Sequence, residues 1–507
     1  MEPLLTSEQI RALDSHTISE IGIPEVVLLE HAALSVSKAL GERFGKSLSQ
    51  TKGLVLAGPG KNGADALACV RLIQEKGCES VGVVLIEGRT PAQLSPLTAM
   101  QLSILGKLGM MTTPEFSKEL LAECDWIIDG IFGTGLQRPL DGKVLDIINQ
   151  VNAVAAQKWI VAVDIPSGLN ADTGRAMPTA IQASETVSFG FLKKGLLTSQ
   201  AADFVGQVRV APIQIPRLLP FPVDAFWFKK EDVSRLPLRK KTSHKGDFGH
   251  VWIVLGTHEK EGASLLSCLG ALKSGAGLVT LLGEKAELDR VRPRLPMEVM
   301  TDTLNKSFFG KAKQGACVIG PGLGLEAWEW LKLALESRLA LVLDADALTL
   351  LSNHDPEAES LLMKRKDIPT VLTPHPKEAS RLLKRSVEEV EADRFQAVKT
   401  LSEKMQCLVL LKGKGTCVRG PLGPTFVMTE GDSGLSKGGS GDLLSGVIAS
   451  QFLQGLSPQQ AVLLSAYLHG RASELLTQKT GSARASLPSE IAQELTHAFS
   501  ELEESKT

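Results

Sequence analysis

The chain has 507 residues, too many for one ordinary hydrophobic core, and a net charge of −2 at pH 7 that gives no reason to expect nucleic acid or an anionic membrane as a partner. Apolar residues make up 43% and charged residues 22%, as in a globular protein. The seven cysteines are scattered, odd in number and never in a CxxC pair, which argues against a disulfide framework or a zinc cage. We therefore expect a protein of the reducing cytoplasm, with no signal peptide and no membrane span.

Residues 6–41 open with TSEQ, a capping-box pattern, and continue as two helical stretches divided by the turn Gly22-Ile23-Pro24. Glu30 lies in the apolar run VVLLEHAAL of the second stretch. A buried Glu needs a partner, so Glu30 is either a support of a site or a carboxylate on the helix face.

Residues 53–77 predict a strand, a glycine turn and a helix. Gly58, Gly60 and Gly63 satisfy GxGxxG, and the next strand ends near Glu87, where a ribose-binding acid is expected, so this fingerprint alone would indicate a dehydrogenase. The turn also carries Asn62 and Asp65 at the place of a pyrophosphate. A carboxylate there disfavours close phosphate contact and favours a cation or a polar nucleotide group.

Two further predicted strands end in polar side chains, Asp129 in residues 125–140, and Asp164 and Ser167 in residues 159–174. The carboxyl ends of parallel strands share one edge of a sheet, so Asn62, Asp129, Asp164 and Ser167 should converge. Such a group of oxygens predicts a bound cation beside a catalytic acid or base. Lys193 and Lys194, which follow in residues 183–197, are either phosphate contacts or solvated charges.

The strings GPGKNGADALACVRL, DGIFGTG, AVDIPSGLNADTG and ETVSFGFLKKGL resemble, in this order, the motifs of the NAD(P)H-hydrate epimerases over most of residues 1–215. The resemblance implies a Rossmann-like three-layer domain that interconverts the R and S hydrates of NADH and NADPH. It implies that Asn62, Asp129 and Ser167 bind potassium and that Asp164 is the catalytic acid or base. The hydrate-binding residues it implies are Lys61, Asn62, Gly63, Ala64, Asp65, Gly133, Thr134, Gly135, Leu136 and Asp164.

One departure from the family concerns the first loop, which usually reads NNGGDG and here reads Lys61-Asn62-Gly63-Ala64-Asp65-Ala66. The loss of two glycines narrows the range of backbone conformations that the loop can adopt, and Lys61 adds a positive charge beside the implied potassium site. A nucleotide-binding domain without turnover therefore stays open as an alternative.

Residues 211–241 break the pattern with several prolines and no lasting period, as a linker does. We predict domains over residues 1–218 and 239–507, joined by a linker over 219–238. In the second block an apolar run repeatedly precedes glycine or polar residues, which predicts strand–helix units over a mostly parallel sheet with its loops at one edge. These runs lie in residues 243–257, 262–282, 317–324, 341–351, 370–383 and 408–418.

The stretch SGLSKGGSGDLLSGVIASQFLQG, residues 433–455, places a glycine-rich turn before an apolar helix. Gly438, Gly439 and Gly441 can bring backbone amides close to a phosphate, and the helix dipole adds to this. Asp442 at that point would repel a resting phosphate, so it is either a base that takes a proton from an attacking hydroxyl or simply an N-cap.

Other loops of this block carry compatible chemistry. Residues 412–416, KGKGT, can neutralise and cradle nucleotide phosphates, although no Walker A motif occurs. Gly322 and Gly324 let a backbone approach a flat ligand, and His375 is held between two prolines, as either a structural residue or a ligand contact.

The strings KGDFGHVWIVLGT, GAGLVTLL, VIGPGLG, DADALTLL, TPHPKEASRLL and GGSGDLLSGVIA resemble the ADP-dependent NAD(P)H-hydrate dehydratases, within the ribokinase-like kinases, over nearly all of residues 235–480. The resemblance implies that Asp442 takes a proton from the hydrate's hydroxyl as it attacks the terminal phosphate of ADP. Elimination of phosphate then restores NADH or NADPH and leaves AMP, and a magnesium ion is expected. The implied hydrate contacts are Ala263, Gly322, Gly324, His375 and Asp442, and the implied nucleotide contacts are Lys412, Gly413, Lys414, Gly415, Thr416, Gly438, Gly439, Ser440 and Gly441.

Together the two halves predict a cytoplasmic α/β enzyme of two three-layer domains, an epimerase fused to a dehydratase, acting on small molecules and forming a homo-oligomer. ATP in place of ADP stays open. The alternative is a small-molecule kinase of ribokinase type fused to a nucleotide-binding domain without turnover.

Overall fold

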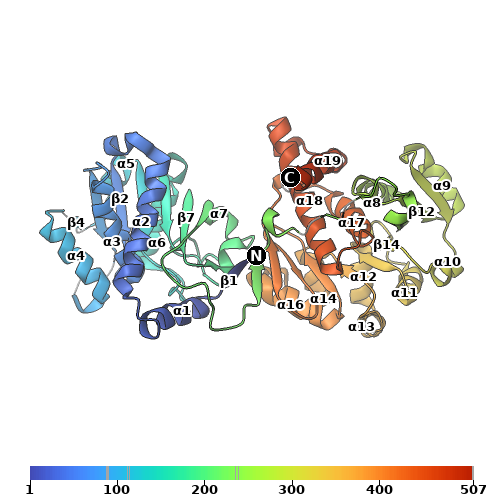
Figure 1. Ribbon diagram of the computed structural model, residues 1–507, viewed down its shortest axis with the longest axis horizontal. Coiled ribbons are helices and arrows are strands. Elements are labelled where there is room, and N and C mark those ends of the chain that lie inside the picture. The colour runs from blue at the N-terminus through green and yellow to red at the C-terminus, as the bar shows by residue number, and fades with distance from the viewer. Residues whose placement is uncertain (87–90, 111, 114, 234–235, 238, 505–507) are drawn as a thin grey trace. The chain divides into compact units, whose positions relative to one another are not determined.

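The computed structural model describes residues 1–86, 91–110, 112–113, 115–233, 236–237 and 239–504. Glu87, considered above as a ribose ligand, lies outside these residues. The chain divides into two compact units, an N-terminal unit of Glu2–Ala225 and a C-terminal unit of Phe226–Thr507 together with Met1 (Figure 1).

The N-terminal unit is built on a parallel sheet with the strand order β4-β3-β2-β5-β6-β7-β9. The strands are β2 (Gly53–Ala57), β3 (Val81–Leu85), β4 (Thr112–Thr113), β5 (Trp126–Gly130), β6 (Trp159–Val163), β7 (Glu185–Phe189) and β9 (Gln207–Ala211). Two short strands, β1 (Glu2–Leu5) and β8 (Leu192–Lys193), pair in parallel outside this sheet. The carboxyl ends of β2, β5 and β6 therefore meet at one edge, as the sequence predicts.

Alternate residues of each strand fill different cores, because successive side chains of a strand point to opposite faces. Val55 and Ala57 pack with α2 and α3, whereas Leu54 and Leu56 pack with α5 and α6. The helices are α1 (Ser7–Ser19), α2 (Glu25–Phe44), α3 (Lys61–Gln74), α4 (Pro96–Lys107), α5 (Lys118–Glu123), α6 (Gly142–Asn152) and α7 (Ala202–Val205). Helices on both faces of a parallel sheet make the predicted three-layer, Rossmann-like domain, which is confirmed.

The first two helices begin where their sequence predicts, and α2 continues three residues beyond the predicted end at residue 41. Thr6 Oγ1 accepts from Gln9 N at 3.2 Å while Gln9 Oε1 accepts from Thr6 N at 3.0 Å, which is the capping box that starts α1. Pro24 precedes α2. Glu30 of α2 pairs with Arg71 of α3, so this carboxylate joins two helix faces.

The C-terminal unit contains a sheet with the strand order β13-β12-β11-β14-β15-β16-β17-β18-β19-β10. The strands from β13 to β17 are parallel and β18 and β19 are antiparallel, so the predicted mostly parallel sheet is confirmed. The strands are β10 (Ala225–Trp227), β11 (His250–Val254), β12 (Leu278–Gly283), β13 (Val299–Thr303), β14 (Ala316–Ile319), β15 (Ala340–Leu343), β16 (Thr370–Leu372), β17 (Leu408–Leu411), β18 (Thr416–Arg419) and β19 (Thr425–Met428).

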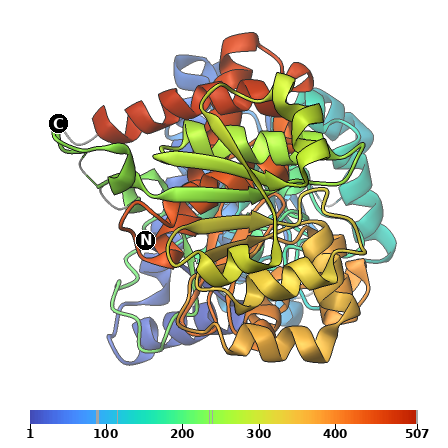
Figure 2. The same ribbon diagram turned by 90° about the vertical axis from the view of Figure 1, so that its right-hand side faces the viewer.

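Helices cover both faces of this sheet, with the C-terminal helices on one side and the helices of the middle of the unit on the other (Figure 2). Buried side chains of α8 (Glu261–Lys273), α9 (Lys285–Val291), α17 (Ser440–Gln451), α18 (Pro458–Thr480) and α19 (Pro488–Glu504) share one core cluster. The remaining helices are α10 (Lys306–Lys311), α11 (Trp328–Glu336), α12 (Asp346–Asn353), α13 (Asp355–Met363), α14 (Pro376–Leu383), α15 (Val387–Ala392) and α16 (Arg394–Met405).

Two glycines let α8 and α17 approach closely. A Cβ on Gly446 would collide with the Ser267 carbonyl oxygen, and a Cβ on Gly270 would collide with that of Leu443. Ser267 Oγ also donates to the Asp442 carbonyl oxygen at 2.8 Å. The helix that carries Asp442 is thereby fixed against α8.

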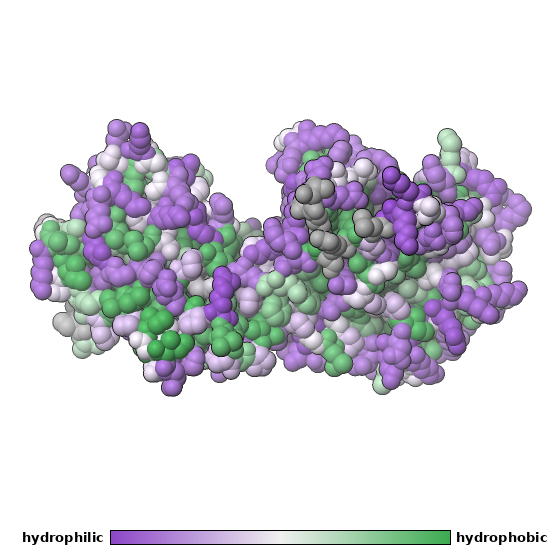
Figure 3. All heavy atoms as spheres, viewed as in Figure 1, coloured by the Kyte–Doolittle hydropathy of each residue, from purple (hydrophilic) through white to green (hydrophobic). Residues whose placement is uncertain are grey.

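All seven cysteines are free and buried. In the ranges that the structure describes, no helix has both the length and the apolar content that a membrane span requires. The face of the molecule in Figure 3 is mainly hydrophilic, with apolar side chains scattered over it.

Candidate active sites

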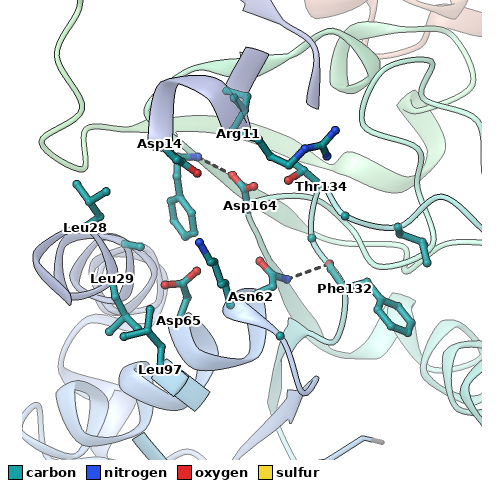
Figure 4. A pocket seen from close by; sticks show the side chains of 18 of the residues that line it. Arg11, Asp14, Leu28, Leu29, Asn62, Asp65, Leu97, Phe132, Thr134 and Asp164 are labelled. Atoms are coloured by element: carbon teal, nitrogen blue, oxygen red, sulfur yellow. Dashed lines mark hydrogen bonds between the residues drawn. The ribbon is translucent and has the colours of Figure 1, made fainter. Parts of the chain in front are cut away.

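The N-terminal unit holds a cavity of about 680 Å³ at the edge where its parallel strands end (Figure 4). Leu28, Leu29 and Leu97 form an apolar part of its wall. The predicted hydrate-binding residues on the wall are Lys61, Asn62, Asp65, Gly133, Thr134, Gly135, Leu136 and Asp164. Gly63 and Ala64 are buried in the first turn of α3, behind this wall.

Two of the three glycines of the GxGxxG pattern, Gly58 and Gly63, allow close backbone packing. A Cβ on Gly63 would collide with the Gly58 carbonyl oxygen, and a Cβ on Gly58 with that of Ile131. The turn after β2 is therefore pressed against both the start of α3 and the loop after β5. This contact brings Asn62 to the loop of Phe132.

Two of the three predicted potassium ligands, Asn62 and Ser167, contact the backbone of Phe132, and the third, Asp129, contacts Ser167. Asn62 Nδ2 donates to the Phe132 carbonyl oxygen at 2.9 Å, and the Phe132 amide donates to Ser167 Oγ at 2.9 Å. Ser167 Oγ in turn donates to Asp129 Oδ1 at 2.5 Å, and Ser167 N donates to Asp129 Oδ2 at 2.7 Å. Burial raises the pKa of Asp129 to about 6, although these hydrogen bonds act to lower it. No cationic side chain of the described residues pairs with this carboxylate, and hard oxygen donors around a buried carboxylate fit a monovalent or divalent cation.

Asp164 follows β6 directly and has a φ of +66°, in the left-handed region that few side chains adopt. Its Oδ1 accepts from Phe189 N at 2.9 Å and from Lys193 Nζ. Lys193 is fully buried and also donates to Ser188 Oγ at 3.1 Å. The interpretation of Lys193 as a solvated charge is therefore wrong.

The same cavity contains two more carboxyls, those of Asp14 and Asp65. Burial raises the pKa of Asp14 to about 6 and that of Asp65 well above its usual range. Lys61, the departure from the family loop, pairs with Glu25 of α2, so its charge is directed to a carboxylate. Sequence reasoning missed Asp14, because it lies on a helix with no motif of its own.

In the C-terminal unit, Asp442 is the third residue of α17, whose N-cap is Gly439 with a φ of +95°. The N-cap reading of Asp442 is therefore wrong. Burial, and next the negative charge of Asp344, raise the pKa of Asp442 to about 6, while Lys412 opposes this. The side chain thus lies at the positive end of a helix dipole without being used as its cap.

Lys412 forms an ion pair with Asp344, with 2.7 Å between Nζ and Oδ1. Asp344 Oδ2 accepts from Ser445 Oγ of α17 at 3.0 Å. A Cβ on Gly441 would lie 3.1 Å from Lys412 Nζ, so the glycine cradle and this lysine are adjacent. Asp344 was also missed from sequence, although an acid that ends a strand was a signal for it.

The loop of residues 412–416 joins β17 to β18, with Gly413 and Gly415 at φ of +136° and +67°. Lys414 Nζ donates to the Thr429 carbonyl oxygen at 2.8 Å, and Thr416 Oγ1 donates to that of Gly413 at 2.8 Å. These two side chains brace the loop, and Lys412 is the residue of the loop that faces Asp442.

His375 is the N-cap of α14, where its Nδ1 accepts from Lys377 N at 3.1 Å. Burial and the positive charge of Lys412 lower the pKa of His375, and Lys412 N donates to the Pro374 carbonyl oxygen at 2.8 Å. The predicted histidine therefore lies in the neighbourhood of Lys412.

Gly322 and Gly324 lie in the loop after β14, and both have positive φ. Gly324 N donates to Asp346 Oδ2 at 2.9 Å, and Asp346 contributes to the raised pKa of Asp442. Ala263 lies in the first turn of α8, the helix fixed to α17. Gly438, Gly439 and Ser440 lead into α17 itself.

The structure is that of a two-domain α/β protein. The N-terminal unit has a cavity where its parallel strands end, and the C-terminal unit has a glycine-led helix with a carboxyl and a lysine, an arrangement that suits phosphoryl transfer. Residues 25–195 match the family model described as YjeF-related protein N-terminus, and residues 251–497 match the one described as NAD(P)H-hydrate dehydratase. The chain belongs to the family of bifunctional NAD(P)H-hydrate repair enzymes, which confirms the resemblance.

Two bifunctional relatives support this assignment over nearly the whole length. The chain is 32% identical to the bifunctional NAD(P)H-hydrate repair enzyme Nnr of Thermofilum pendens, covering 93% of this chain and 92% of that protein. It is 33% identical to Nnr of Moorella thermoacetica, covering 99% and 97%. It is also similar to the crystal structure of the ADP/ATP-dependent NAD(P)H-hydrate dehydratase from Bacillus subtilis co-crystallized with ATP/Mg2+, at 29% identity and a TM-score of 0.48, covering 54% of this chain and 98% of that one.

Proposed function

We propose that this protein repairs hydrated NADH and NADPH, with one reaction in each unit. The N-terminal unit epimerises the R and S hydrates, and the C-terminal unit dehydrates the S hydrate at the expense of ADP, giving AMP and phosphate. The observation that carries the second assignment is Asp442, a buried carboxyl beside Lys412 at the start of a glycine-led helix. We assign residues 1–218 to the epimerase, 239–507 to the dehydratase and 219–238 to the linker.

In the dehydratase site, the Asp442 carboxylate takes the proton of the hydrate's hydroxyl as that oxygen attacks the terminal phosphate of the nucleotide. A pKa of about 6 makes this carboxyl a stronger base than an ordinary aspartate, while it is still ionised at neutral pH. Lys412 and the amides that lead into α17 offset the charge that spreads over the transferring phosphoryl oxygens. Elimination of phosphate from the phosphorylated hydrate then restores the double bond of the nicotinamide ring.

Magnesium fits this site as an ion carried by the nucleotide. Across the described ranges, no group of three or more His, Cys, Asp or Glu side chains is placed to hold a metal. Mg²⁺ in phosphoryl-transfer sites is bound mainly by substrate phosphates and water, with one or two carboxylates from the protein. Bound there, it neutralises charge on the phosphoryl oxygens.

In the epimerase site, the chemistry centres on Asp164, which Lys193 and the Phe189 amide hold in place on the cavity wall. Asn62, Asp129 and Ser167 would hold potassium, whose charge would balance that of the buried Asp129 carboxylate beside the loop of residues 131–136. Gly133, Thr134, Gly135 and Leu136 of this loop line the cavity and contact the hydrate.

The rival function is a ribokinase-type small-molecule kinase with a first unit that only binds nucleotide. The test gives the purified protein each hydrate epimer with magnesium and either ADP or ATP, in buffers with and without potassium. Repair predicts released phosphate together with recovered near-ultraviolet absorbance of the reduced nicotinamide, whereas a stable phosphorylated product identifies a kinase. If the R hydrate is consumed no faster than spontaneous epimerisation allows, the N-terminal unit has no epimerase activity.

We also propose a cytoplasmic, homo-oligomeric protein. The seven free cysteines support the reducing compartment, because a secreted chain of this length would be expected to pair some of them. Size-exclusion chromatography with light scattering tests the oligomeric state.

A further inference from the structure

Asp14 occupies a defined place in the N-terminal cavity. It lies on α1, next to Leu13, which is fully buried in a small core. The helix therefore presents Asp14 to the cavity from a fixed position. Figure 4 shows Asp14 and Asp164 on adjoining parts of the wall, brought there by segments far apart in the sequence. The charged groups that face Asp14 come from four elements and are Lys193, Asp164, Lys61, Glu25 and Asp65.

The Asp14 and Asp164 carboxyls have opposite surroundings. Asp164 accepts hydrogen bonds from Lys193 Nζ and Phe189 N, both of which are partners for the ionised form. No hydrogen bond or ion pair from the residues that the structure describes reaches the Asp14 carboxyl. Burial raises the pKa of Asp14 to about 6 against the opposing effect of Lys193. Asp164 thus has two hydrogen-bond donors as partners and Asp14 has none from the described residues, an asymmetry that suits one carboxyl that accepts a proton and one that donates it.

The chemistry of epimerisation calls for such a pair. Hydration of an enamine places the hydroxyl on the carbon bonded to the ring nitrogen, and this carbon is the one whose configuration is inverted. Inversion through loss and return of water has a planar intermediate, so the leaving hydroxyl and the incoming water lie on opposite faces of the ring. One carboxyl of fixed position serves one face, and a second group must serve the other.

We propose that Asp14 is a second catalytic residue of the epimerase, the acid that protonates the leaving hydroxyl while Asp164 acts as base toward the incoming water. This inference rests on the epimerase function proposed above.

Protons, electrons and bonds balance over the loss and return of water. The Asp14 proton passes to the hydroxyl, the carbon–oxygen bond breaks, and the nitrogen lone pair forms a carbon–nitrogen double bond as water departs. Water then adds to the other face, the double-bond electrons return to nitrogen, and the proton lost by this water passes to Asp164. The turnover ends with Asp14 ionised and Asp164 protonated, and exchange with solvent or the reverse reaction restores the starting state.

Asp65 is a second carboxyl of the wall to which no hydrogen bond or ion pair from the described residues is made. Burial, and then the charges of Asp164 and Asp14, raise the pKa of Asp65 well above its usual range. Acid catalysis is most effective when the pKa of the donor lies near the working pH, and Asp14 meets this condition.

The test uses the full chain and Asp14→Asn, a substitution that preserves size and hydrogen bonding but has no proton to give. Conversion of the purified R hydrate to the S hydrate is followed by chromatographic separation of the epimers, from pH 5 to 8, with the spontaneous rate subtracted. We expect kcat at pH 6 to fall about 100-fold or more with KM nearly unchanged. The wild-type decline of activity as pH rises through about 6 should also be absent.

Dehydration of the S hydrate with ADP by the same preparation reports on folding. The matched control is Asp146→Asn, at an exposed position of α6.

Asp14→Glu separates a chemical role from a structural one, since it keeps a proton donor. It should retain at least tenfold more epimerase activity than Asp14→Asn. Equal losses in the two variants overturn the inference, as does an Asp14→Asn enzyme that keeps its rate or its pH profile. If the wild-type protein itself fails to accelerate epimerisation, the proposed function of the unit fails, and the inference fails with it.

Discussion

The substitution Asp442→Asn should abolish dehydration and at the same time stabilise the C-terminal unit. The carboxyl is largely buried, and its pKa is raised from 3.8 to about 6 mainly by that burial. A difference of this size between the folded and unfolded states corresponds to about 3 kcal/mol of destabilisation, and about 2 kcal/mol is a fair expectation after partial solvation is considered. The sign follows from the direction of the pKa: the penalty is absent below pH 4, grows between pH 4 and 6, and is complete above pH 6.

Activity should respond in the opposite direction. Loss of a general base costs about 10²- to 10⁴-fold in rate, equivalent to about 3–5 kcal/mol of transition-state stabilisation. Wild-type dehydration should decline as pH falls through about 6, because the base becomes protonated, and the residual activity of the variant should lack this decline.

Two measurements decide this prediction. Dehydration of the S hydrate with ADP and magnesium is followed by the near-ultraviolet absorbance of the product, and urea unfolding of both proteins is compared at pH 4.5 and pH 7.5. An inactive variant that is also less stable at pH 7.5 would show that Asp442 supports the structure and would refute the reasoning. Activity above one tenth of wild type would refute its role as the base.

Three further outcomes follow from the two sites. Asp164→Asn should lower epimerisation about 10²- to 10⁴-fold and spare dehydration, measured on separate epimers; equal loss of both activities would argue against two independent sites. Lys412→Met leaves the buried Asp344 without its cation and should cost about 3–5 kcal/mol in urea unfolding, together with loss of ADP binding in calorimetry; an unchanged unfolding midpoint would contradict this. Gly446→Ala drives a methyl group toward the Ser267 carbonyl oxygen and should cost about 1–3 kcal/mol by thermal unfolding, whereas Gly310→Ala, a helical position with open space around it, should stabilise the protein by up to about 1 kcal/mol.

The layered fold was predictable because local patterns and global packing agree. The strand of residues 53–57 is apolar on both faces, as a central parallel strand must be, and the helix that follows it starts at a glycine turn. The capping box at Thr6 and the break at Pro24 gave the starts of two helices without any tertiary information. The antiparallel hairpin of β18 and β19 was less accessible, since the loop before it reads like any other glycine loop of the unit.

The sites were predictable where a residue ends a strand and less so where it depends on a distant partner. Asp129 and Ser167 share an edge of the sheet, and their hydrogen bond follows from topology. Lys193 looks like an ordinary charge in the sequence, and only the fold shows that Asp164 is its partner. Asp14 reaches the cavity through the packing angle of α1, which no local pattern encodes.

The burial of every thiol has a consequence for how this protein tolerates oxidants. Burial raises the pKa of all seven cysteines above the usual range, so the reactive thiolate is scarce at neutral pH. Peroxide and disulfide reagents act on exposed thiolates, and this chain presents none of its cysteines to them. We therefore expect the folded protein to resist thiol-specific reagents, because its seven thiols lie in the cores.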